Sequence, residues 1–157
     1  MLRTKGASPV SKKQAKNTWY PLDNAGVLYS AIQKDRYSAI YRFSAVMTEP
    51  VNPPLLQRAV EKTMPRFPGF AVRMRRGAFW CYFEPNPNPG PFVKQDMVNP
   101  CQPVRFREDN EWLIRIFYYE HRISLEVFHA ISDGAGTLVF FRTLLAVYLR
   151  ELGYTIP

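Results

Sequence analysis

Apolar and polar residues alternate along residues 37–47, and this alternation predicts a strand with one buried face. The apolar side of the strand comprises Ala39, Tyr41, Phe43, Ala45 and Met47. After Asn52 the spacing becomes helical, with apolar residues at Leu55, Leu56, Ala59, Val60 and Met64. Pro53 and Pro54 suit the first turn of this helix, and we expect the helix to end before Pro65.

The middle of the chain predicts shorter strands separated by turns. Residues 69–84 are rich in aromatic side chains and predict a strand pair that turns near Arg76 and Gly77. Residues 85–91 alternate proline with asparagine and glycine, which excludes both a helix and a central strand. We therefore expect a hairpin followed by an irregular loop.

Residues 112–119 and 123–130 are two strand-length apolar runs, and we expect them to form an antiparallel hairpin joined by residues 120–122. Alternation places four residues on one side of the second strand, namely Ile123, Leu125, Val127 and His129. The imidazole thus continues an apolar row and should lie partly screened from water.

Residues 137–149 predict a helix that is apolar on nearly all sides, with little polar surface beyond Arg142 and Thr143. The surface helix of a small domain normally has a polar face about half its circumference wide. We therefore expect something outside this domain to cover part of the helix, either another domain or a second copy of the chain.

Between the last strand and this helix lies the sequence His-Ala-Ile-Ser-Asp-Gly, which has the pattern HxxxDG over residues 129–134. Neutral imidazole, with an ordinary pKa of about 6.5, is suited to removing a proton from a hydroxyl or an amine. The motif therefore makes His129 a candidate general base. Gly134 fits a sharp turn from loop to helix, because glycine tolerates backbone angles that other residues resist.

Three other interpretations of the motif remain open. His129 could be a core histidine with no chemical role. His129 and Asp133 could be metal ligands one helical turn apart, although the glycines at 134 and 136 argue against a helix there, and His121 is the only other histidine. Ser132 suggests a hydrolase, but no G-x-S-x-G elbow surrounds it.

The HxxxDG motif, together with the sequence Tyr-Pro-Leu-Asp-Asn-Ala-Gly at residues 20–26, resembles the chloramphenicol acetyltransferase-like superfamily. This superfamily includes the condensation domains of peptide synthetases and the alcohol acetyltransferases. The chain is most similar to the N-terminal half of a bacterial alcohol acetyltransferase-like protein. The resemblance implies an α+β fold, a two-layer sandwich of a mixed, largely antiparallel sheet flanked by helices, with a short helix over residues 24–32.

The resemblance also implies an activity, namely transfer of an acyl group from a coenzyme A thioester to an alcohol, with His129 as general base. Asp133 would point away from the substrate and pair with an arginine, for which Arg36 and Arg42 are candidates. Acetyl-CoA or acyl-CoA would be a co-substrate, with no tightly bound cofactor. The alternatives are a non-catalytic acyl- or carrier-binding module and a condensation-type domain that acts on carrier-bound thioesters. A second half of the enzyme would cover the helix at 137–149, or the chain would self-associate there.

Composition and charge add limits to this picture. A chain of 157 residues with 46% hydrophobic residues suits one domain, and no apolar run is long enough to span a bilayer, so we expect a cytoplasmic protein. The net charge is +8, but five basic residues precede the first acidic one, which predicts a disordered leader at 1–16 and a folded domain at 17–157. The remaining excess of three needs no nucleic acid partner, and a basic nucleic-acid-binding domain is the weakest alternative. Cys81 and Cys101 are expected to be free thiols.

Overall fold

The computed structural model describes residues 20–22, 26–27, 38–78, 80–96, 99–105 and 108–156. The strands are β1 (Tyr20–Pro21), β2 (Ile40–Val46), β3 (Val72–Arg76), β4 (Cys81–Pro85), β5 (Val93–Gln95), β6 (Ile114–Tyr119) and β7 (Arg122–Phe128). The long helices are α2 (Pro53–Thr63) and α3 (Gly134–Glu151). Short 3-10 helices lie at Met64–Arg66, Pro68–Phe70 and Asp109–Glu111. The expected leader at 1–16 lies outside the described residues. So does most of the expected helix at 24–32, of which Gly26 and Val27 are described, both helical.

A four-stranded sheet with the order β2-β7-β6-β5 is the centre of the fold. β6 and β7 form the predicted antiparallel hairpin, and β2 pairs with the other edge of β7, also antiparallel. β5 runs parallel to β6, which makes the sheet mixed but largely antiparallel, as predicted. β5 itself was not predicted, because three residues are too few to show an alternating pattern.

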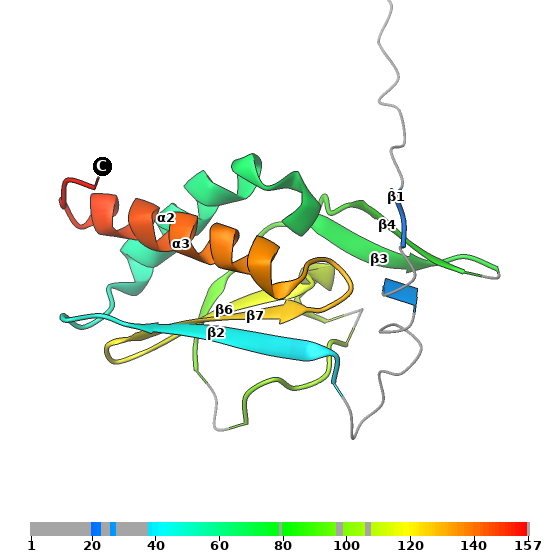
Figure 1. Cartoon of the computed structure of the whole chain (residues 1–157), viewed down its shortest axis with the longest axis horizontal. Helices are drawn as coiled ribbons and strands as arrows, with labels where there is room; N and C mark the ends of the chain where they lie inside the picture. Colours follow the sequence, from blue (N-terminus) through cyan, green and yellow to red (C-terminus); the bar gives the residue numbers. More distant parts are fainter. Residues whose placement is uncertain are drawn as a thin grey trace, which may run out of the picture.

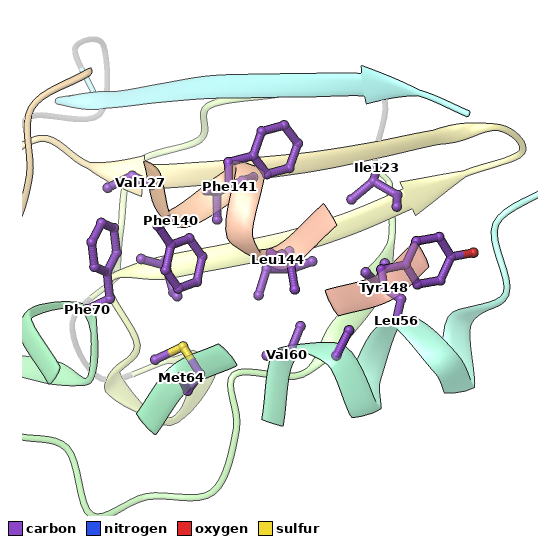
Figure 2. Close-up of a cluster of buried hydrophobic side chains, with 14 of the residues drawn as sticks. Leu56, Val60, Met64, Phe70, Ile123, Val127, Phe140, Phe141, Leu144 and Tyr148 are labelled. Atoms are coloured by element: carbon purple, nitrogen blue, oxygen red, sulfur yellow. The ribbon is translucent and has the colours of Figure 1, made fainter. Parts of the chain in front are cut away.

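Helices α2 and α3 lie side by side over one face of this sheet (Figure 1). Helix α2 begins as its sequence suggests. Asn52 caps α2 by accepting a hydrogen bond from the Leu55 N–H (3.1 Å), and prolines occupy the first turn. The apolar sides of both helices meet the inward side of β6 and β7 in one core (Figure 2). Its buried members include Leu56, Val60, Met64, Phe70, Ile123, Leu125, Val127, Phe140, Phe141, Leu144 and Tyr148. The fold is therefore α+β, as expected.

A second, smaller sheet has the order β1-β4-β3 and is antiparallel throughout. It contains the predicted hairpin, whose turn is closed by a hydrogen bond from the Gly77 N–H to the Trp80 carbonyl (2.7 Å). Its inner residues pack with Phe128 and Leu113 in a separate cluster whose other members are Ala39, Val72, Met74, Phe83 and Val104. The strands thus form two sheets, where a single mixed sheet was expected.

Two predicted boundaries near the HxxxDG motif are wrong. β7 ends at Phe128 rather than at residue 130, so His129 belongs to the turn that follows the strand. Helix α3 begins at Gly134 rather than at residue 137, because Asp133 supplies a cap that offsets the low helix propensity of two glycines in the first turn. None of the described helices is long and apolar enough to cross a membrane.

Candidate functional site

His129 lies immediately beyond the end of β7, on the face of the sheet that the helices cover. Its backbone N–H donates to the carbonyl of Ala39 (2.8 Å), so the pairing with the β2 side of the sheet extends one residue past the strand. Its side chain is half-buried, and its ring lies against the ring of Tyr41, with centroids 4.7 Å apart. Ile123, Leu125 and Val127 lie on the helix side of β7 as predicted, and His129, in the turn after the strand, contacts Tyr41, which packs against the same core.

Asp133 is the N-cap residue of α3. Its Oδ1 accepts a hydrogen bond from the Gly136 N–H (2.7 Å), and its backbone carbonyl accepts from the Thr137 N–H (3.1 Å). The residue is exposed, and its backbone is extended, as an N-cap requires. Asp133 therefore fixes the point at which the turn bearing His129 becomes a helix.

The expected pairing of Asp133 with Arg42 is wrong. Arg42 lies in β2 on the opposite face of the sheet, where its guanidinium makes a bidentate contact with Asp96 (2.7 and 2.9 Å) and also contacts Glu126 (2.6 Å). Adjacent residues of a strand point to opposite faces, so Arg42 cannot share a side with its neighbour Tyr41. The other candidate, Arg36, lies outside the described residues.

Arg42 belongs to a buried ionic cluster that was not predicted from the sequence. Glu126, which is 2% exposed, also contacts Arg115 (3.0 Å) and accepts from the Cys101 N–H (2.6 Å). Burial alone would lower the pKa of Arg42, but the hydrogen bonds that its guanidinium donates to Asp96 and Glu126, together with the negative charge of these carboxylates, raise the pKa above its usual value.

Cys101 lies at the margin of this cluster, where burial raises the pKa of its thiol, and the nearby Glu126 carboxylate raises it further. A raised pKa disfavours the thiolate, which is the reactive form of cysteine. Cys81 and Cys101 are both free, as expected.

The two glycines of the first turn of α3 differ in how strictly their positions require glycine. Gly134 is the first residue of the helix and has no positive φ, and a Cβ added there would meet no atom within 4 Å, so neither the backbone nor the space at this position requires glycine. A Cβ on Gly136 would lie 2.7 Å from the Ser132 Oγ and 3.2 Å from the Asp133 Oδ1. Gly136 is therefore the residue that lets the cap approach the helix closely.

Tyr41 is the residue of this site that the sequence did not identify. The alternation along β2 placed it on the apolar side, but nothing in the sequence shows which residue of β7 lies opposite it. The register pairs Tyr41 with Val127, which makes His129 its diagonal neighbour.

Other features lie away from this site. His121 is in the turn between β6 and β7, at the opposite end of β7 from His129, so the two histidines are not brought together. Among the described residues, no group of three or more histidine, cysteine, aspartate or glutamate side chains is placed to hold a metal ion. A cavity of about 260 Å³ lies at the β5 edge and is lined by Phe92, Lys94 and Trp112, among others, without contact to the motif.

Comparison with known proteins shows the fold but no closer relationship. No family model matches the sequence, and no curated protein matches it significantly. The starter condensation domain of the rhizomide synthetase RzmA matches with a TM-score of 0.65 and 15% identity over 89% of this chain and 40% of that one. The first condensation domain of the calcium-dependent antibiotic synthetase, in complex with a substrate analogue, matches with a TM-score of 0.62 and 19% identity. The match covers 89% of this chain and 40% of that one.

A third solved structure, the complex of the X-domain and OxyB from teicoplanin biosynthesis, matches with a TM-score of 0.68 and 14% identity, covering 97% of this chain and 37% of that one. The chain thus spans about two fifths of the length of the structures it matches. It shares the fold of part of a condensation domain.

Proposed function

We propose that this chain carries the general base of a thioester-dependent acyltransferase, and that the base is His129. The observation that carries the proposal is the position of the HxxxDG segment. It forms the turn between a buried strand and a capped helix, with the imidazole half-buried at the end of the sheet. A half-buried position keeps a base accessible to an acceptor while limiting competition from water.

The proposed reaction needs no covalent intermediate on the protein. The imidazole takes the hydroxyl proton of the acceptor as the acceptor oxygen attacks the carbonyl carbon of the thioester. The carbon–sulfur bond then breaks, and the imidazolium returns the proton to the departing thiolate. The products are an ester and a free thiol, and His129 ends in its starting protonation state.

For the donor we propose acetyl-CoA or acyl-CoA, and for the acceptor a small alcohol, as the resemblance to alcohol acetyltransferases implies. A carrier-bound thioester is the second candidate, because the structures that share the fold include condensation domains of synthetases. Both donors present the same phosphopantetheine thioester, so the two candidates share one chemistry. They differ in whether a carrier protein must bind.

We further propose that another domain of the intact enzyme covers the start of α3. Leu138 is 43% exposed and Val139 is 58% exposed, although both lie in a helix whose other side is part of the core. The solved structures that share the fold are more than twice as long as this chain. Self-association of the chain through the same residues would be visible as a dimer in light scattering and would replace this part of the proposal.

Thiol release tests the proposed function directly. The intact protein, and separately this chain, would be incubated with acetyl-CoA or an acylated carrier and a panel of small alcohols. We expect His129→Ala to lower turnover about 10²- to 10⁴-fold while donor binding stays nearly unchanged. His121→Ala removes the other histidine and is the matched control, with turnover expected at the wild-type level.

Two outcomes would contradict the assignment. Equal turnover in the wild type and His129→Ala would make His129 a core residue. Donor binding without any turnover in the intact wild-type protein would favour the non-catalytic acyl- or carrier-binding module.

A further inference from the structure

We infer that Tyr41 is a positioning residue for His129, and that its phenol holds the turn bearing the motif against the sheet. Tyr41 is 88 positions away from His129 in the sequence, yet it contacts that turn through both its hydroxyl and its ring. Only the expected effect on turnover rests on the proposed function.

The hydroxyl of Tyr41 is the meeting point of three polar groups from the segment that follows His129. It donates toward the backbone carbonyls of Ser132 (3.0 Å) and Asp133 (2.9 Å), and it lies 2.5 Å from the Oγ1 of Thr137. Thr137 is fully buried, so its hydroxyl needs an internal partner. If the Thr137 hydroxyl donates to the phenol oxygen, the phenol can donate its own proton, shared between the two carbonyls. Both hydroxyls then have a hydrogen-bond partner.

The backbone carbonyl of Asp133 is shared between two elements. It accepts from the Thr137 N–H (3.1 Å) as the first hydrogen bond of α3, and it also accepts from the phenol of Tyr41. The start of the helix, the end of the turn and the edge strand β2 are therefore fixed relative to one another at this single point.

The ring of Tyr41 acts on the other end of the same turn. It lies against the imidazole of His129 at an interplanar angle of 57°, and it also makes a T-shaped contact with the ring of Phe43, with ring centroids 5.9 Å apart. The backbone of His129 is held at the same place by the carbonyl of Ala39. The imidazole thus has a fixed backbone and a wall on one side, which restricts the orientations that its ring can adopt.

A purely structural role for Tyr41 makes a different prediction from a positioning role. If the role is only structural, removal of the Tyr41 hydroxyl lowers the stability of the protein but leaves the environment of the His129 ring unchanged. Loss of a positioning contact changes the environment of His129 and lowers turnover per folded molecule, because small misplacements of a catalytic group have large effects on rate. The chain contains only two histidines, so their imidazole signals in an NMR spectrum report on His129 with His121 as an internal reference.

The test compares Tyr41→Phe with Tyr148→Phe. Tyr148 is buried in the helix-side core, at whose margin Tyr41 is half-buried. The Tyr148 hydroxyl accepts from the Asn52 N–H (2.8 Å), so Tyr148→Phe removes the same oxygen far from the motif. We expect Tyr41→Phe to shift or broaden the His129 imidazole signals while those of His121 stay unchanged. We expect Tyr148→Phe to leave both sets unchanged. In the acyl-transfer assay, Tyr41→Phe should lower kcat about 10- to 100-fold with little change in KM.

Thr137→Val and Thr137→Ser extend the test if Tyr41→Phe does not fold. The valine variant removes the second hydroxyl and should perturb the His129 signals, whereas the serine variant retains it and should restore them. Unchanged His129 signals in folded Tyr41→Phe and in Thr137→Val would overturn the inference. Perturbed signals in a protein that shows no acyl transfer would support the positioning contact and overturn only the proposed function.

Discussion

The two faces of the four-stranded sheet are held by different kinds of interaction. The face under α2 and α3 is almost wholly apolar, with Ile123, Leu125 and Val127 fully buried beneath the helices. The opposite face carries the ionic cluster, in which Asp96 and Glu126 side chains are only 3% and 2% exposed. Residues 99–105 contact that cluster, since the Cys101 N–H and the Gln102 carbonyl both bond to it.

We infer from this difference that the apolar face mainly stabilises the fold, whereas the ionic cluster mainly selects the arrangement of the strands. Apolar contacts on the helix side are non-directional, so they determine that α2 and α3 bind the sheet but define their positions less sharply. The ionic cluster stabilises only when each group meets its partners, since an unpaired buried charge costs several kcal/mol. It can therefore fix which strand lies beside which. Variants of Phe140 and Glu126 test this comparison, and variants at the start of α3 test the cap beside the apolar face; they follow in order of expected effect.

Phe140→Ala should be the most destabilising change, lowering the free energy of unfolding by about 3–5 kcal/mol. Phe140 is fully buried and stacks on Phe70, with ring centroids 4.6 Å apart. It also makes a T-shaped contact with Phe67, with ring centroids 5.1 Å apart. Leu138→Ala, in the same helix but exposed, is the control and should cost about 0.5 kcal/mol or less. Chemical denaturation measures both. A small loss of stability in Phe140→Ala would show that packing of the helices on the sheet contributes little to the free energy of unfolding.

Glu126→Gln should lower stability by about 2–3 kcal/mol, because it keeps the shape of the side chain but removes a charge that faces Arg42 and Arg115. Glu151→Gln makes the same change at an ion pair whose partners Arg58 and Lys62 are more than half exposed, and it should destabilise the protein far less. Equal losses would mean that the cluster is no more demanding than a surface pair, and the contrast between the faces would fail.

The same contrast explains what could be predicted from the sequence. The helix-side elements were identified because their apolar periodicity is local, as in β2 and in the β6–β7 hairpin. The ionic cluster joins Arg42 to residues 54 and 84 positions away, and no local pattern indicates such pairs. The chemistry of His129 was predicted from its motif, but its contact with Tyr41 depends on strand register, which a single sequence does not show. The resemblance implies that Asp133 pairs with an arginine but does not identify which one, and the candidate Arg42 is wrong because it bonds to Asp96 and Glu126 on the opposite face of the sheet.

Asp133→Ala should lower stability by about 1 kcal/mol, the usual value of a helix N-cap. A buried ion pair would instead cost about 3–5 kcal/mol, so the size of the effect distinguishes the cap from the expected pair. Asn52→Ala, which removes the cap of α2, is the control and should give a similar loss. Asp133→Asn keeps a good capping side chain without the charge, and it should be nearly neutral. A large loss of stability in Asp133→Asn would instead indicate that the charge of Asp133 has an oppositely charged partner.

The smallest effect is expected at Gly134, where alanine should raise stability by about 0.5–1 kcal/mol. The backbone there is ordinary and the space is open, so a methyl group costs nothing in the folded state and reduces the freedom of the unfolded chain. Gly136→Ala should have the opposite sign, because its methyl group would press on Ser132 and displace the Asp133 carboxylate from its hydrogen bond. Thermal unfolding of the two variants measures this difference. If Gly134→Ala lowers stability while Gly136→Ala does not, the cap geometry described for α3 is wrong. If Gly134→Ala is stable but slows acyl transfer in the intact protein, the open space beside Gly134 is occupied during the reaction.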